Sequence, residues 1–262
     1  FSTKQASIEF YHSPYIEYVI SIFMFVSGIN FTLLLLFVNG KFRKFIHDAE
    51  LKWYLWSVIG FTAFIAIVLY YNSSMGVEEA FRKSLFQVAS LHTSTGFATA
   101  DYMTWPSVLW GTLTVIMIIG ACAGSTTGGM KCIRLLILAK ISRNEFKHIT
   151  HPNAVLPVRV NKQVISPSIR STVLAFSFLY AVLIIVGTLA MMGMGVGLLE
   201  SLGCTISSLG NMGPGLGLCG PAYSWNELPD MGKWLMSFFM LLGRLELFTV
   251  LLLFSSDFWK KN

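Results

Sequence analysis

The sequence predicts an all-α polytopic membrane protein with repeated helical units and one broken helix. Hydrophobic residues make up 54% of the 262 residues and charged residues only 12%, whereas a soluble domain carries about 25% charged residues. Each of the long apolar stretches can cross the ~30 Å hydrocarbon core as a helix rising ~1.5 Å per residue. These stretches are residues 15–38, 53–71, 104–121 with a continuation to about 140, 169–192 and 231–256.

Lysine and arginine are distributed unevenly between alternate loops. Segments 41–52, 131–170 and 257–262 carry 14 of the 19 Lys and Arg residues, the loops on the other side carry 4, and Arg244 lies within an apolar stretch. Because cytoplasmic loops of membrane proteins are enriched in Lys and Arg, the first group is expected in the cytoplasm. Topology thus explains the net charge of +6, and no nucleic-acid partner is expected.

Two shorter segments, residues 79–92 and 198–209, lie between these spans and are too short to cross. About twelve helical residues extend only ~18 Å, so each segment can enter the membrane and turn back. A loop of Gly and small polar residues follows each one, and irregular backbone at membrane depth is tolerated only inside protein or beside a water-filled cavity. Two ordinary helices outside the membrane remain an alternative.

The order of span, short helix, polar loop and span occurs twice, over residues 53–140 and 169–256. Aligning Gly96 with Gly213 also places Ser90 on Ser207, and internal repeats around an axis are a common way to build a membrane pathway. The letters FST at residues 1–3 resemble FAT at 97–99. We therefore expect the chain to begin within an earlier repeat, as the C-terminal part of a longer protein.

The polar loop that follows each short helix has the composition of one wall of a cation filter. Main-chain carbonyls can replace the water around a dehydrated cation, and the negative end of the helix dipole lies next to the loop. Gly96 permits the positive φ that turns several carbonyls in one direction. His92, beside this loop, is expected to pack or to form a hydrogen bond rather than bind a metal.

The stretch GACAGSTTGGM at residues 120–130 lies where the middle of a span is expected. Its density of Gly, Ser and Thr favours a broken helix, although a small-residue face for helix packing is an alternative. A phosphate-binding loop is excluded, because Met130 occupies the place of the required Lys.

A second polar feature within an apolar stretch is Arg244. Such residues usually face a protein interior or a water-filled cavity, so Arg244 either pairs with another helix or acts as a fixed charge in a cation path, as a barrier or a latch. The four cysteines have no metal-ligand spacing. Three of them lie in or beside apolar segments, and we expect buried thiols at those three and no disulfide framework.

Four motifs together carry a resemblance to a known family. STGFATADY at 94–102, AGSTTGGMKCIR at 123–134, NMGPGLG at 211–217 and GRLELFT at 243–249 resemble the Trk/Ktr/HKT superfamily of potassium transporters, most closely its bacterial Trk-type membrane subunits. The resemblance implies four repeats of membrane helix, pore helix, filter loop and membrane helix around one ion path. This chain would hold the end of repeat two in residues 1–50, repeat three in 51–150 and repeat four in 151–262.

The resemblance also implies which residues form the filter and the gate. The filter residues would be Thr93, Ser94, Thr95, Gly96 and Phe97 in repeat three and Gly210, Asn211, Met212, Gly213 and Pro214 in repeat four. The gate would be an intramembrane loop below the filter together with the arginine that faces it: Gly120, Gly124, Ser125, Thr126, Thr127, Gly128, Gly129 and Arg244.

The function implied by the resemblance is potassium uptake across the bacterial inner membrane, without an enzymatic step or a cofactor. K⁺ would be the transported ion and would be held only at the filter. The expected partners are the missing N-terminal repeats, a second copy in a homodimer, a cytoplasmic nucleotide-binding regulatory subunit of TrkA type and the lipid bilayer. The resemblance implies that two of the four filter walls lie outside this chain.

Two other functions are alternatives. A cation-coupled secondary transporter with discontinuous helices needs an acidic coupling site at mid-membrane, for which Glu246 is the single candidate. An intramembrane hydrolase needs a nucleophile and a base, but the sequence has no G-x-S-x-G pattern and no convincing Ser–His pair.

Overall fold

Helices form almost all of the regular structure in the computed structural model, which describes residues 7–245, 247–253 and 256–259. The α-helices are α1 (Pro14–Ser27), α2 (Phe31–Val38), α3 (Phe42–Ile46), α4 (Ala49–Asn72), α5 (Val77–His92), α6 (Ser107–Ile119), α7 (Cys132–Thr150), α8 (Pro167–Gly193), α9 (Leu198–Gly210), α10 (Asp230–Arg244), α11 (Leu247–Leu252) and α12 (Ser256–Trp259). The 3-10 helices are η1 (Ser7–Tyr11), η2 (Tyr102–Thr104), η3 (Gly217–Cys219) and η4 (Trp225–Glu227). A two-stranded antiparallel hairpin, β1 (Arg159–Val160) and β2 (Gln163–Val164), is the small addition to the predicted all-α class.

The two longest helices begin at capping residues and are apolar along their length. The Asp48 carboxylate accepts a hydrogen bond from the Leu51 N–H at 2.9 Å at the start of α4, and Ser166 accepts one from Ile169 at 3.4 Å at the start of α8. Both helices are long and apolar enough to cross a membrane, and only 28% of the most apolar window of each is buried. Their outward faces therefore match a lipid environment.

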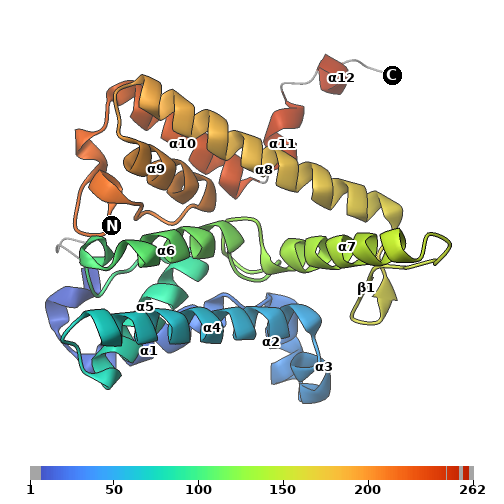
Figure 1. Ribbon diagram of the computed structural model, residues 1–262, viewed down its shortest axis with the longest axis horizontal. Coiled ribbons are helices and arrows are strands. Elements are labelled where there is room, and N and C mark those ends of the chain that lie inside the picture. Colours follow the sequence, from blue (N-terminus) through green and yellow to red (C-terminus); the bar gives the residue numbers. More distant parts are fainter. Residues whose placement is uncertain (1–6, 246, 254–255, 260–262) are drawn as a thin grey trace.

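The helices form two groups separated by α6 and α7, which lie end to end across the middle of Figure 1. One group contains α1, α4 and α5, and the other contains α8, α9 and α10. Each group encloses a hydrophobic core, the first around Tyr54 and Leu109 and the second around Phe239 and Leu209. The short helices α5 and α9 occupy the interior, since nearly every residue in the second half of each is buried.

The apolar stretch 15–38 is bent, which the sequence did not predict. α1 and α2 meet at 103°, and the Asn30 side chain caps α2 by accepting a hydrogen bond from the Thr32 N–H at 2.8 Å. A Cβ atom at Gly28 would lie 2.9 Å from Thr93 Cγ2 and 2.9 Å from Tyr54 Cζ. Only glycine therefore allows the chain to turn this close to the end of α5.

The predicted break at residues 120–130 is confirmed, because α6 ends at Ile119 and α7 begins at Cys132. The predicted span 231–256 is also divided, with α10 ending at Arg244 and α11 beginning at Leu247. Among the described residues, two helices can cross a membrane by length and composition, or three spans if α1 and α2 count as one. Besides the predicted break at residues 120–130, the stretches 15–38 and 231–256 are therefore each built from two shorter helices rather than one continuous helix.

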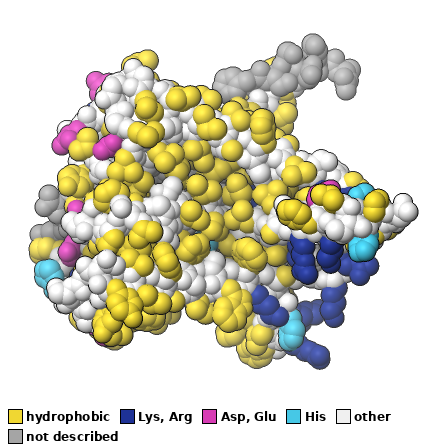
Figure 2. All heavy atoms as spheres, in the orientation of Figure 1, with side chains coloured by type: hydrophobic (Ala, Val, Ile, Leu, Met, Phe, Trp, Pro, Cys, Tyr) yellow, Lys and Arg dark blue, Asp and Glu magenta, His cyan; other side chains and the backbone are white. Residues whose placement is uncertain are grey.

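Charged side chains lie mainly at the two ends of the molecule. Figure 2 shows hydrophobic side chains over the middle of one face, with Lys and Arg gathered at the end that contains α3 and the β-hairpin. We call this the basic end; exposed Lys41, Arg43, Lys44 and Lys162 contribute to it. Acidic side chains such as Glu78 and Asp230 lie at the starts of α5 and α10. An apolar belt between two charged ends is the pattern of a membrane-embedded protein.

Candidate functional site

The loop after α5 turns sharply at the buried end of the helix. The Thr95 N–H donates to the Ser90 carbonyl at 2.9 Å, and the hydroxyls of Thr93 and Thr95 are 2.7 Å apart. Ser94 and Gly96 have positive φ values of 53° and 79°. The positive φ expected at Gly96 is therefore present, and it reverses the direction of the main chain over one residue.

The carbonyls of this loop divide into two kinds. Within the described part of the chain, no donor forms a hydrogen bond with the main-chain carbonyls of Ser94, Thr95 or Gly96. The Phe97 carbonyl, in contrast, accepts a hydrogen bond from the Ser90 hydroxyl at 2.5 Å. Carbonyls that lack protein donors are the groups that can coordinate a dehydrated cation. Phe97 thus fits the predicted set less well than its three neighbours.

The loop after α9 has a similar turn. Asn211 is left-handed, with φ 52°, and Gly213 has φ 102°. The Asn211 side-chain amide donates to the Met240 carbonyl in α10 at 3.1 Å, while Met212 and Pro214 are buried. No described residue donates a hydrogen bond to the carbonyls of residues 211–214. Both predicted filter loops therefore present unpaired carbonyls at the end of a buried short helix.

A disulfide holds the second loop in place, which corrects the expectation of buried thiols without a disulfide. Cys204 in α9 and Cys219 in η3 are bonded, with their Cα atoms 6.2 Å apart. The Gly215 N–H donates to the Cys219 carbonyl at 2.6 Å, and the Tyr102 hydroxyl donates to the Gly215 carbonyl. Sequence spacing could not reveal the bond, because proximity across the loop comes from folding. Cys122 and Cys132 are buried free thiols, as expected.

The segment between α6 and α7 contacts the ends of both short helices. The Gly128 N–H donates to the Ser94 hydroxyl at 3.2 Å. A Cβ atom at Gly128 would lie 2.7 Å from the Gly210 carbonyl carbon and closer still to its oxygen. We call residues 120–130 the loop segment; its second half therefore lies directly against both predicted filter loops.

Arg244 at the end of α10 reaches the loop segment from the other helix group. Its Nη1 donates to the Thr126 carbonyl at 2.8 Å. A cavity of about 300 Å³ adjoins this contact. Its lining includes Ser125, Thr126, Thr127, Gly128, Gly129 and Arg244. The structure thus brings together six of the eight predicted gate residues.

The other two predicted gate residues have different surroundings. A Cβ atom at Gly120 would lie 3.5 Å from Gly129 Cα, so the two ends of the loop segment pack against each other at Gly120. The Gly124 carbonyl accepts a hydrogen bond from the Phe31 N–H at 3.2 Å, which ties it to the α1–α2 bend. Both have positive φ values, 65° and 70°. They shape the loop segment rather than line the cavity.

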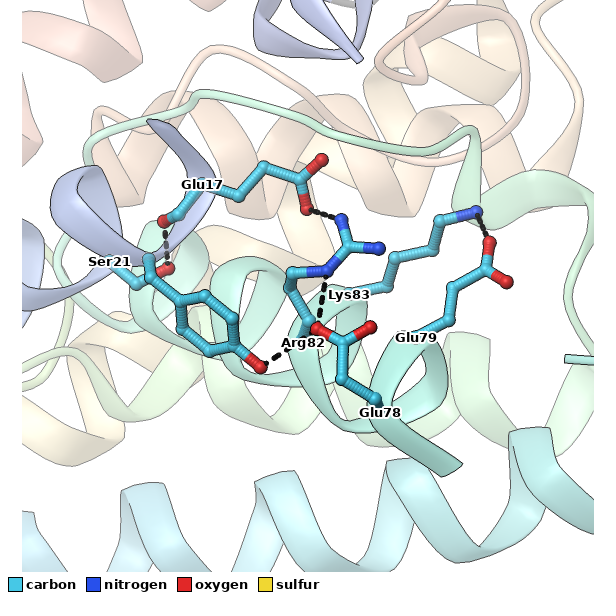
Figure 3. Close-up of polar contacts among 7 residues, drawn as sticks. Glu17, Ser21, Glu78, Glu79, Arg82 and Lys83 are labelled. Carbon is cyan, nitrogen blue, oxygen red and sulfur yellow. Dashed lines mark hydrogen bonds and ion pairs between the residues drawn. The ribbon is translucent and has the colours of Figure 1, made fainter. Parts of the chain in front are cut away.

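Two charged contacts, one at the loop segment and one at the start of α5, were not predicted from the sequence. The Glu50 carboxylate at the start of α4 accepts a hydrogen bond from the Ala123 N–H at 2.6 Å. At the start of α5, Arg82 Nη1 lies 2.5 Å from a carboxylate oxygen of Glu17 in α1, and Arg82 Nε lies 2.9 Å from Glu78 (Figure 3). Single acidic residues at helix starts give no sequence signal of such pairings. The contacts of Glu50 with Ala123 and of Arg82 with Glu17 join residues far apart in the chain.

A second ion pair stabilises the first turns of α5. Lys83 Nζ lies 2.7 Å from a carboxylate oxygen of Glu79, as Figure 3 also shows. The hydrogen bond from Lys83 and its positive charge hold the pKa of Glu79 below its ordinary value. The start of α5 is therefore stabilised by the Lys83–Glu79 pair within the helix and by the Arg82–Glu17 pair with α1.

His92 has the role that the sequence predicted. Its Nε2 lies 2.8 Å from the Ser57 hydroxyl in α4, and its ring packs edge-on against Tyr54 at 5.2 Å. The described residues contain no group of three or more His, Cys, Asp or Glu side chains that could hold a metal ion. Glu246 and the residues FST at 1–3, both used in the sequence predictions, lie outside the described residues.

The chain is similar to bacterial potassium transport proteins. The TrkH family, described as "Cation transport protein", matches residues 1–261. The Trk system potassium uptake protein TrkH of Escherichia coli K12 is 35% identical over 267 residues, which covers 100% of this chain and 54% of that protein. The TrkH of Halomonas elongata is 34% identical over 264 residues, with the same shares.

A solved structure agrees with these sequence relatives. The crystal structure of the potassium transporter TrkH from Vibrio parahaemolyticus superimposes with a TM-score of 0.92 at 32% identity, and covers 99% of this chain and 56% of that one. The chain thus spans about half the length of the curated relatives it matches. The match over nearly its whole length shows that the chain belongs to the TrkH family of cation transport proteins.

Proposed function

We propose that this chain forms two neighbouring walls of a potassium filter in a potassium uptake protein. The observation that carries the proposal is the set of unpaired carbonyls at Ser94–Gly96 and at 211–213, each at the end of a buried short helix. Carbonyl oxygens in such loops can replace the hydration shell of K⁺. The names of the relatives, which are potassium uptake proteins, support K⁺ as the transported ion.

The gate in this proposal is the loop segment with Arg244. Residues 125–129 lie beneath the two filter loops, and Arg244 holds them through the Thr126 carbonyl. A cation that leaves the filter would meet both the segment and a fixed positive charge. Flux therefore requires the second half of the loop segment to move aside, which breaks the bond from Arg244.

The division of the chain is also part of the proposal. Residues 51–150 and 151–262 would be repeats three and four, and residues 1–50 would hold the end of repeat two. The complete filter needs the walls supplied by the other half of a full-length protein. We propose that the full-length protein forms a homodimer in the bacterial inner membrane and binds a nucleotide-binding subunit of TrkA type at the basic end.

Substitution of Gly96 tests the filter. The full-length protein would be reconstituted in liposomes, and Rb⁺ influx would be measured in competition with K⁺ and Na⁺. Gly96→Ser should reduce the preference for K⁺ over Na⁺, because a side chain disfavours the φ of 79° by about 1–2 kcal/mol and so shifts the carbonyls. Gly76→Ser is the control, since Gly76 lies at the other end of α5 with no atom within 4 Å of its Cβ position. An unchanged ion preference in Gly96→Ser would show that the filter is elsewhere.

A further inference from the structure

The two halves of the loop segment are held in different ways. The first half is docked on the α1–α2 bend by main-chain hydrogen bonds, from Cys122 N–H to the Gly28 carbonyl at 3.1 Å and from Phe31 N–H to the Gly124 carbonyl at 3.2 Å. The second half, residues 125–129, lines the cavity and contacts the filter loops. We call residues 121–124 the base and residues 125–129 the arm.

Glu50 is the charged side chain that joins this base. It lies in the first turn of α4, is only 6% exposed, and accepts the Ala123 N–H at 2.6 Å. A carboxylate at this depth is costly to bury unless it is hydrogen-bonded, and a charge-assisted hydrogen bond is about twice as strong as a neutral one. The bond therefore fixes Ala123, the residue that precedes Gly124 at the end of the base.

Arg244 holds the arm far less firmly than Glu50 holds the base. Arg244 is exposed to solvent, and its described contact with the segment is a single hydrogen bond to the exposed Thr126. The base, in contrast, has two main-chain hydrogen bonds and a buried carboxylate. Residues 125–129 are thus held by the hydrogen bonds from Arg244 and to Ser94, and residues 121–124 by the main chain of the α1–α2 bend and by Glu50. We therefore expect residues 125–129 to move before residues 121–124.

We propose that Glu50 is a positioning residue of the gate, which anchors the loop segment at Ala123 so that only residues 125–129 swing away from the filter. This inference rests on the proposed function of the loop segment as the gate. It assigns Glu50 no contact with the ion. Glu50 acts through the main chain of the segment and determines where the arm closes.

The test compares Glu50 variants in the full-length protein in liposomes, with Rb⁺ influx as the readout. Glu50→Ala removes the acceptor of the Ala123 N–H, so residues 125–129 are no longer positioned against the filter loops. Resting influx should rise about tenfold, which is the effect of losing one charge-assisted hydrogen bond. Glu50→Gln keeps an acceptor oxygen and should restore influx to within about twofold of the wild type. Glu145→Ala, which alters an exposed glutamate of α7, is the control and should change nothing.

Glu50→Asp covers the case in which Glu50→Ala does not fold. Its shorter side chain keeps the charge but cannot reach Ala123 N, so influx should again rise. A folded Glu50→Ala or Glu50→Asp protein with wild-type influx would overturn the inference, and so would a Glu50→Gln protein as leaky as Glu50→Ala. If Arg244→Ala raises Rb⁺ influx and Gly96→Ser lowers the preference for K⁺ while the Glu50 variants behave like the wild type, only the role of Glu50 is wrong. If none of these variants has an effect, the proposed function itself fails.

Discussion

A methyl group at position 128 is the sharpest probe of the contact between the loop segment and the predicted filter loop after α9. In Gly128→Ala the new Cβ would lie 2.7 Å from the Gly210 carbonyl carbon. Carbon atoms that are not bonded to each other pack at about 3.5–4.0 Å, so the segment or the end of α9 must retreat by roughly 0.8 Å or more. The neighbouring atoms are main chain on both sides, so no side-chain rotation can relieve the overlap.

The displacement should weaken closure rather than unfold the protein. Overpacking at one site costs about 1–3 kcal/mol, and it falls on the closed arrangement, in which Gly128 also donates to Ser94. If the whole cost falls on the closed state, the ratio of closed to open protein drops by about 5-fold to about 150-fold. Resting Rb⁺ influx of the full-length protein in liposomes should rise accordingly.

Gly193→Ala is the matched control for this measurement. Gly193 ends α8, and no atom lies within 4 Å of its Cβ position, so influx should remain at the wild-type level. A Gly128→Ala protein that elutes as a folded species and conducts like the wild type would refute the close contact. A lower influx would refute the idea that this contact closes the path.

Three further predictions concern the bonds around these loops. Arg244→Ala removes the hydrogen bond from the arginine to the loop segment, and Rb⁺ influx should rise while the thermal midpoint stays within a few degrees; a protein that only fails to insert would instead indicate a structural role. Cys219→Ser opens a disulfide that spans 15 residues, so stability against thermal unfolding should fall by about 3 kcal/mol, and equal midpoints with and without the bond would contradict this. Arg82→Gln leaves the Glu17 carboxylate buried without its cation and should lower the free energy of unfolding by about 3 kcal/mol. Lys83→Gln should lower it by less than about 1 kcal/mol, because the partner Glu79 is 40% exposed. Equal losses in the two variants would show that burial of the first pair is unimportant.

Local chemistry made part of this structure predictable. Glycine density at residues 120–130 predicted the break between α6 and α7, because glycine weakens a helix wherever it occurs. The short helices were predicted from their length and from the polar loops that follow them, and the structure places them at Val77–His92 and Leu198–Gly210. These features depend on neighbours within a few residues.

Features that depend on distant partners were not predictable. The bend between α1 and α2 is stabilised when Gly28 accepts a hydrogen bond from Cys122, and neither residue signals the other in the sequence. The same holds for Gly128 against Gly210 and for Glu50 with Ala123. The candidate filter residues were predicted from their motifs and stay a prediction, whereas the contacts that hold the loop segment in place depend on three-dimensional proximity.

The Cys204–Cys219 disulfide also bears on which way the molecule faces. Disulfides persist in oxidising compartments and are rare where glutathione and thioredoxin keep thiols reduced. The bond joins α9 to η3, in the part of the molecule away from the basic end (Figure 1, Figure 2). Redox chemistry therefore supports an exterior position for the α9 loop, and the distribution of Lys and Arg supports a cytoplasmic position for the opposite end. These two unrelated kinds of chemistry favour the same orientation for the proposed transport protein, in which a cation arriving from outside would meet the cross-linked loop first.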